Sequence, residues 1–139
     1  MQATIGIQVD LYWYSIGEPD LFFSFFSSIV VHLEKSKWGS RFPVVMNDLY
    51  QGKVEVDKLE ACRKELEVIR EELKQFGPDQ VIWDCEHPEK MPPWDEIDPD
   101  IKDLSEYYIS SSGEDLFEVL LTAIQDGLEY KADLEIETL

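Results

Sequence analysis

Residues 80–94 read Gln-Val-Ile-Trp-Asp-Cys-Glu-His-Pro-Glu-Lys-Met-Pro-Pro-Trp, a short apolar run that changes abruptly into a polar, proline-rich segment. The β-branched and aromatic side chains of the first part are typical of a buried strand, which we place at Gln80–Asp84. The acids, the prolines and the second tryptophan that follow predict a surface loop from Cys85 to Asp100. We therefore expect a core strand that leads into an acidic, aromatic loop.

The charge of the chain is strongly negative and unevenly distributed. Its 139 residues include 30 acids and 12 bases, for a net charge of -18. Residues 1–53 hold 5 of the acids, so the other 25 lie in residues 54–139. A field of this sign repels nucleic acid and anionic membranes and attracts cationic protein surfaces, although it also serves solubility alone.

Composition favours one ordered domain over residues 1–139, because 44% hydrophobic and 12% aromatic residues suffice for a packed core. The first ten residues lack the basic segment of a secretory signal, and the apolar window Leu21–Leu33 is too short to span a bilayer. Cys62 and Cys85 are too few for a disulfide framework. We expect a cytoplasmic protein without a membrane span.

Helices are predicted where apolar residues recur at helical spacing. The helix Pro19–Lys35 is apolar around most of its circumference, and its serines mark a face that meets water or lies close against another backbone. A helical turn follows at Val44–Tyr50. The helix Asp57–Phe76 carries one apolar stripe, and a further helix follows a cap at Ser112 and ends at Gly127. The stripe residues recur at steps of three and four: Leu59, Cys62, Leu66, Ile69, Leu73 and Phe76.

Strands are predicted from β-branched, aromatic or alternating runs. Thr4–Tyr14 is one strand, Leu104–Ser110 is a weaker candidate, and the tail from Tyr130 alternates as a half-buried antiparallel strand does. With Gln80–Asp84, these elements predict an α+β fold in a single domain, with a small, mostly antiparallel sheet packed against three main helices.

Motifs for metal binding and catalysis are poorly represented. Cys85 and His87 form the one close pair of zinc-type ligands, and their spacing to the other Cys and His matches no zinc finger. The acids of Asp95–Asp100 suit calcium but lack the glycine and the final glutamate of an EF-hand. No phosphate-binding loop or nucleophile elbow occurs. We expect no cofactor, no metal and no enzymatic activity; a hydrolase using Asp84 or Glu86 is the least favoured alternative.

A partner-binding surface is better supported. Trp94 follows a stiff Pro92-Pro93 pair among acids, and an aromatic anchor with a polar rim is typical of a binding hot spot. The competing interpretation is that Trp94 folds back into the core, and Trp83 is a further candidate for the interface. The residues predicted to contact a partner all lie in one segment: Asp84, Glu86, Glu89, Trp94, Asp95, Glu96, Asp98 and Asp100.

A short basic connector, residues 35–43, carries three cations beside Trp38. Three cations in so acidic a chain make a nucleic-acid site unfavourable. We expect Arg41 to pair with the acidic half of the chain instead, either within the fold or across a dimer.

Six short motifs lie between Val9 and Trp94 and carry a family resemblance. They are Val9-Asp-Leu-Tyr-Trp-Tyr14, Gly17-Glu-Pro-Asp20, Gly39-Ser-Arg-Phe-Pro43, Leu49-Tyr-Gln-Gly-Lys53, Pro78-Asp-Gln-Val-Ile-Trp-Asp84 and Pro92-Pro-Trp94. Together they resemble the immunity protein 70 family of bacterial polymorphic toxin systems, and the resemblance is weak after Trp94. It implies a small cytoplasmic protein that is made beside a toxin and blocks the toxin domain by binding it, with no catalytic residues to carry over.

The acid excess is compatible with this implication, because a nuclease toxin is basic where it grips nucleic acid. We therefore predict an immunity protein whose acidic, tryptophan-containing loop binds a cognate toxin domain, for which a basic nuclease is the inferred type. The alternative is an acidic regulatory or structural protein that forms a homodimer through residues 57–76, since the apolar stripe also has the spacing of a heptad seam.

Overall fold

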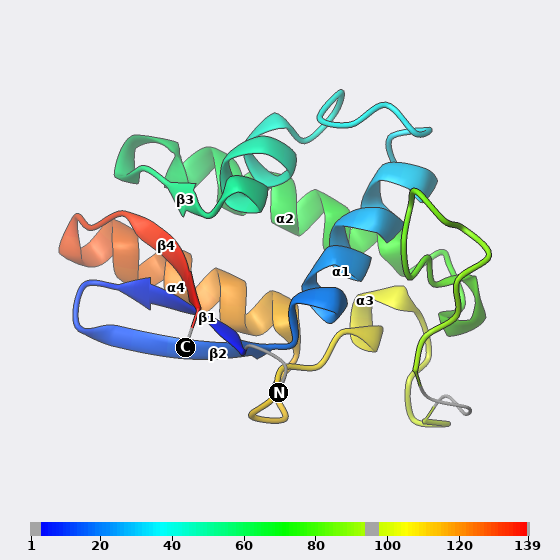
Figure 1. The fold of residues 1–139 in the computed structure, drawn as a ribbon. Coiled ribbons are helices and arrows are strands. Elements are labelled where there is room, and N and C mark those ends of the chain that lie inside the picture. The colour runs from blue at the N-terminus through cyan, green and yellow to red at the C-terminus, as the bar shows by residue number, and fades with distance from the viewer. Residues whose placement is uncertain (1–3, 94–97, 139) are drawn as a thin grey trace.

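The chain begins with a β-hairpin that supplies two of the four strands (Figure 1). The computed structural model describes residues 4–93 and 98–138. β1 (Ile5–Val9) and β2 (Tyr12–Gly17) are joined by a two-residue turn, in which Asp10 has a left-handed φ of 51°. The prediction of one strand over Thr4–Tyr14 is therefore wrong, because Asp tolerates left-handed backbone and allows the apolar run to fold back on itself.

The first and last strands of the chain lie side by side at the centre of the sheet. The strand order is β2-β1-β4-β3, and every neighbouring pair is antiparallel. β4 (Leu134–Thr138) pairs with β1 along its whole length, and β3 (Lys53–Val54) adds a short edge. The alternating tail is thus confirmed as an antiparallel strand from Leu134 onward, with Leu134 buried and Glu137 exposed, whereas Tyr130, the predicted start, belongs to the preceding helix.

Three long helices accompany the sheet, which confirms the α+β class. They are α1 (Pro19–His32), α2 (Leu59–Leu73) and α4 (Leu116–Tyr130); α3 (Leu104–Tyr107) is a single turn. A π-helical segment lies at Val44–Leu49, and 3₁₀ turns lie at Val56–Lys58 and Pro78–Gln80. In Figure 1, α4 lies behind β1 and β2, and α2 packs against α4.

The apolar stripe of α2 is used by the core of its own chain. Its five helical members are fully buried: Leu59, Cys62, Leu66, Ile69 and Leu73. The stripe is therefore confirmed as a core-facing surface, and these side chains are not free to form the heptad seam of a dimer. The helix begins at Leu59 instead of Asp57, because residues 56–58 form a 3₁₀ turn.

No strand forms at Gln80–Asp84, so this prediction is wrong. After the 3₁₀ turn at Pro78–Gln80, residues 81–84 run as irregular backbone along α1. Ser28 of α1 accepts a hydrogen bond from the backbone N–H of Ile82 (3.0 Å), and Ser24 donates to the carbonyl of Ile82 (2.8 Å). Side chains of a helix thus satisfy the backbone groups that a neighbouring strand would otherwise satisfy.

The contact with α1 extends beyond Ile82. Ser27 accepts a hydrogen bond from the backbone N–H of Cys85 (3.0 Å), and Ser24, Ser27 and Ser28 are all fully buried. Of the two interpretations of these serines, close contact with another backbone is therefore confirmed.

A buried tyrosine completes this contact. The Tyr108 hydroxyl lies 2.7 Å from Ser28 Oγ and donates to the backbone carbonyl of Ser24 (3.0 Å). We call Ser24, Ser27, Ser28 and Tyr108 the serine–tyrosine cluster. Tyr108 has no exposed surface, and burial raises the pKa of its hydroxyl far above the ordinary value, so it stays a neutral donor.

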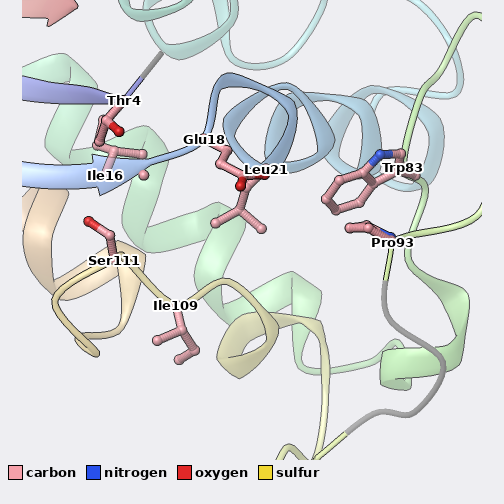
Figure 2. A pocket seen from close by; sticks show the side chains of 9 residues that line it. Thr4, Ile16, Glu18, Leu21, Trp83, Pro93, Ile109 and Ser111 are labelled. Atoms are coloured by element: carbon pink, nitrogen blue, oxygen red, sulfur yellow. The ribbon is translucent and has the colours of Figure 1, made fainter. Parts of the chain in front are cut away.

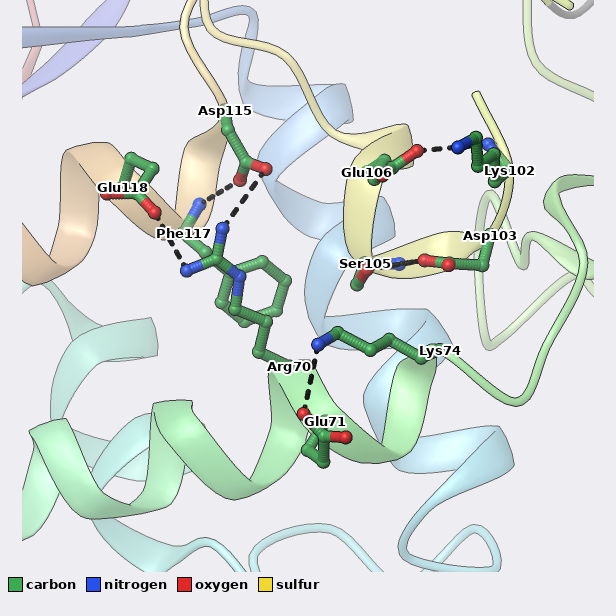
Figure 3. Close-up of polar contacts among 10 residues, drawn as sticks. All are labelled: Arg70, Glu71, Lys74, Lys102, Asp103, Ser105, Glu106, Asp115, Phe117 and Glu118. Atoms are coloured by element: carbon green, nitrogen blue, oxygen red, sulfur yellow. Dashed lines mark hydrogen bonds and ion pairs between the residues drawn. The ribbon is translucent and has the colours of Figure 1, made fainter. Parts of the chain in front are cut away.

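Tyr108 follows α3, which replaces the weaker strand candidate Leu104–Ser110. α3 begins at a cap in which the Asp103 carboxylate accepts from the backbone N–H of Ser105 (2.9 Å; Figure 3). An Asp side chain that accepts a hydrogen bond from the backbone N–H two residues later can act as a helix N-cap, so Asp103 favours a helical turn over a strand.

Helix α4 is capped by Asp115 and not by Ser112. The Asp115 carboxylate accepts from the backbone N–H of Phe117 (2.8 Å) and also lies 3.6 Å from Arg70 of α2 (Figure 3). The helix passes Gly127, where we had expected it to end, and stops at Lys131 in a left-handed conformation.

Replacement of Ser28 by Ala tests the serine–tyrosine cluster. The backbone N–H of Ile82 and the Tyr108 hydroxyl both lose a partner, so we expect the free energy of unfolding to fall by about 1–3 kcal/mol. Urea denaturation measures the change. Ser40→Ala, at an exposed serine for which the structure shows no side-chain hydrogen bond, is the matched control and should change stability by less than about 0.5 kcal/mol. Equal effects of the two substitutions would contradict the cluster's structural role.

The thiol of Cys62 tests the burial of the α2 stripe. Cys62 has no exposed surface, and burial raises its pKa to about 12, so at pH 8 only about one molecule in 10,000 carries the thiolate. We expect iodoacetamide to leave Cys62 unlabelled in the folded protein and to label it in guanidinium, as read by peptide mass spectrometry. Rapid labelling of Cys62 in the folded protein would show that the stripe does not face the core.

Candidate functional site

We call residues 84–100 the acidic loop; of these, the structure describes residues 84–93 and 98–100, and residues 84–93 lie beside α1 on the side away from β3 (Figure 1). The loop starts at the segment that the serine–tyrosine cluster holds on α1. Two of its acids shape its turns, because the Asp84 carboxylate accepts from the N–H of Glu86 (2.9 Å) and the Asp98 carboxylate accepts from the N–H of Asp100 (2.9 Å). The described parts of the loop are therefore held both by α1 and by their own side chains.

Most of the predicted contact residues within the described ranges are at the surface. Glu86, Glu89, Asp98 and Asp100 are exposed, and Asp84 is half-buried. The other three predicted contacts lie outside the described residues: Trp94, Asp95 and Glu96. The described carboxylates can thus reach a partner, and those of Asp84 and Asp98 also shape the loop.

Cations of this protein pair with acids elsewhere. Arg70 joins Asp115 and Glu118 of α4 (Figure 3), and Lys53 lies 3.7 Å from Asp133. In residues 4–93 and 98–138, none of the ion pairs formed by Lys or Arg involves an acid of the acidic loop. Within the loop, the Glu89 carboxylate lies 3.9 Å from Nδ1 of His87. The negative charge of the exposed loop acids is therefore not neutralised by a Lys or Arg of the described chain.

One of these pairs confirms a sequence prediction. Arg41 donates two hydrogen bonds to the Glu72 carboxylate of α2, at 2.7 and 2.6 Å. Arg41 thus pairs with the acidic half of the chain within the fold. Its hydrogen bonds hold the pKa of Glu72 below the ordinary value.

A pocket of about 430 Å³ lies next to the acidic loop (Figure 2). Four segments of the chain form its walls. They are the residue before β1, the end of β2 together with the start of α1, residues 83–93, and the segment after α3. The lining residues are Thr4, Ile16, Gly17, Glu18, Leu21, Trp83, Pro93, Ile109 and Ser111. No local sequence pattern marks this set, because the four segments meet only in the folded chain.

Trp83 is part of this pocket and not an exposed anchor. Its side chain is 5% exposed and lies beside Pro93 at one side of the pocket (Figure 2). The ring of Trp83 is packed into the fold and lines this pocket, and its part in an interface stays a prediction.

The groups that could carry metal binding or catalysis are dispersed in the described chain. Within the described ranges, no group of three or more His, Cys, Asp or Glu side chains is placed to hold a metal ion. The carboxylate of Asp84 is engaged in its own turn, and Glu86 is exposed on the loop. None of the helices in these ranges has both the length and the apolarity that a membrane crossing requires.

Comparison with known proteins gives one match. The family model described as Immunity protein 70 matches residues 7–136. The match extends well past Trp94, where the resemblance of the short motifs fades. No curated protein and no solved structure is significantly similar to the chain.

Proposed function

Because the chain belongs to the immunity protein 70 family, we propose that it neutralises a cognate toxin domain by binding it through the acidic loop and the adjacent pocket. The observation that carries this proposal is the set of exposed acids in the loop that pair with no Lys or Arg of the described chain. In this proposal residues 1–139 act as one domain in the cytoplasm, and the pairing of β1 with β4 supports the single domain.

The favoured partner is a cationic toxin, of which a nuclease is one type. Exposed, unneutralised carboxylates attract a positive surface over a long range and accelerate the encounter. A nuclease offers such a surface, because it neutralises phosphates with Lys and Arg. Glu86, Glu89, Asp98 and Asp100 would then occupy positions that phosphates otherwise take.

Hydrogen bonds hold the described parts of the loop in place before a partner binds. Ser27 holds Cys85 on α1, and Asp84 and Asp98 each accept a hydrogen bond from the backbone N–H two residues further on. A segment that is already ordered loses less conformational entropy on binding, so more of the contact energy appears as affinity.

The pocket adds a place for an apolar anchor of the toxin. Ile16, Leu21 and Ile109 give it apolar walls, and Ile109 is 40% exposed at the surface. A desolvated pocket next to a polar rim is the common anatomy of a binding hot spot. In this arrangement the pocket controls how long the complex lasts, and the acids control how fast it forms.

Charge reversal in the loop tests the electrostatic part of the proposal. In the double variant Glu86→Lys and Glu89→Lys, we expect the association rate with an inactivated toxin, encoded beside the immunity gene, to fall on the order of tenfold at 50 mM salt. The loss should shrink at 500 mM salt, where charges are screened. Surface plasmon resonance measures both rates.

The matched control is Glu55→Lys with Asp57→Lys. These residues are exposed next to β3, far from the loop, and their replacement changes the net charge by the same amount. Equal slowing by both double variants would show that only total charge matters. An association rate that does not respond to salt would overturn the electrostatic part. Failure of the wild-type protein to rescue growth of cells that express the active toxin would overturn the immunity function itself.

Truncation in the pocket tests the apolar anchor. Ile109→Ala should speed dissociation of the toxin complex on the order of tenfold and leave the association rate nearly unchanged. Val68→Ala on α2, where the side chain is 44% exposed, removes a similar apolar surface elsewhere and should have little effect. If Ile109→Ala leaves dissociation unaltered, the anchor lies outside this pocket.

A further inference from the structure

The outer edge of β2 is the longer of the two sheet edges. β3, at the other edge, has two residues, whereas β2 has six. Because the hairpin turn has two residues, Val9 and Tyr12 form a hydrogen-bonded pair. Hydrogen-bonded and non-hydrogen-bonded pairs alternate along an antiparallel ladder, so the backbone N–H and C=O of Trp13 and Ser15 point away from β1. These groups are available to a further strand.

The open stretch of this edge lacks charge and proline, and the register shift of the β1–β2 ladder lies beyond it, at Ile16. Sheet edges are commonly protected by lysine, proline, a bulge or a covering segment. The stretch Tyr12–Ser15 reads Tyr-Trp-Tyr-Ser, without charge or proline. Across the described ranges, the one backbone hydrogen bond from another segment to this edge joins the N–H of Ser111 to the carbonyl of Ile16 (3.0 Å), beyond the open stretch.

Apolar surface lies at the hairpin end of the same edge. Leu11 is 90% exposed, and the rings of Tyr12 and Tyr130 pack with centroids 5.6 Å apart while 42% and 46% of these residues remain exposed. We call these three residues the hairpin patch. Large exposed apolar side chains that are grouped in this way are typical of an interaction site.

A hollow of about 200 Å³ lies along the edge itself. Its lining residues are Trp13, Tyr14, Ser15, Ser112, Glu114 and Val119. An added strand would thus find backbone partners at Trp13 and Ser15 and a recess for a side chain beside them.

The charge around the edge is negative. Burial and a hydrogen bond to the Asp126 carboxylate raise the pKa of Tyr14 to about 12, and the charge of Glu114 contributes in the same direction. A hydrogen bond to Tyr12 and the charge of Glu129 raise the pKa of Tyr130 to about 12. The carboxylate of Asp126 thus contacts Tyr14 and Glu114 lines the hollow beside the edge, which favours a cationic occupant and opposes a second copy of a chain with net charge -18.

We propose that an extended, cationic segment of the toxin adds to the free edge of β2 as a fifth strand and places an apolar side chain on the hairpin patch. The identification of the partner as the toxin rests on the proposed function. The free edge, the hairpin patch and the hollow are observed independently of it. Ile16 and Gly17, at the far end of β2, line the larger pocket, so one partner can contact the edge, this pocket and the acidic loop together.

Amide hydrogen exchange of the whole protein, with and without the inactivated toxin, tests the proposal directly. We expect the N–H groups of Trp13 and Ser15 to be protected at least tenfold more in the complex. Protection confined to the acidic loop would overturn strand addition and leave the proposed function standing. Absence of any complex would overturn both. Protection of the same amides in a toxin-free dimer would assign the edge to a second copy of the chain.

A proline substitution provides the second measurement. Ser15→Pro removes the outward N–H without removing a hydrogen bond to β1, so toxin affinity should fall at least tenfold. Ser15→Ala keeps the N–H and should bind within about twofold of the wild type. Unchanged affinity of a folded Ser15→Pro variant would overturn the proposal. If thermal denaturation shows that this variant does not fold, the amide-exchange result on the wild type decides.

Discussion

The position of the acidic loop depends on a few buried hydroxyl groups on α1. Ser24 and Ser28 satisfy the backbone of Ile82, Ser27 satisfies the N–H of Cys85, and Tyr108 fixes the two outer serines. Without these bonds, a segment that forms no sheet ladder would bury unsatisfied backbone groups at a cost of about 1–3 kcal/mol each. The serine–tyrosine cluster therefore satisfies the backbone hydrogen-bonding groups of this irregular segment, as a neighbouring strand does in a sheet. It also fixes the position from which the acidic loop begins.

Ion pairing separates the acids of this protein into two groups. On α2, on α4 and just before β4, Glu72, Glu118 and Asp133 face cations and stabilise contacts between segments. In the acidic loop, the described acids pair with no Lys or Arg of the described chain. Exposed acids outside the loop, such as Glu55 and Asp57, also form no ion pair in the described ranges, so the loop acids differ from them by their place beside the pocket, on backbone that hydrogen bonds hold. This combination is what a fast-binding inhibitor of a cationic protein requires.

The pocket connects features that are far apart in the chain. Ile16 and Gly17 bring the end of the open strand edge to it, and Trp83 and Pro93 bring the acidic loop. Strand addition at β2 and charge recognition at the loop are therefore compatible with one partner that spans both. The buried indole of Trp83 contributes to the wall of this pocket, whereas the hairpin patch adds exposed aromatic surface at the other end of β2.

The sequence by itself determined the elements whose signal is local. Apolar spacing located α1, α2 and α4, and strict alternation located β4, because each pattern records which face of one element is buried. Only the tertiary structure showed that Gln80–Asp84 forms no strand, that Thr4–Tyr14 contains a hairpin turn, and that a pocket lies beside Trp83. A β-like composition indicates that a segment is buried and extended. It does not indicate the hydrogen-bond partners of the segment, because these are distant in sequence. Here those partners are the serines of a helix, and no local pattern in residues 80–84 contains that information.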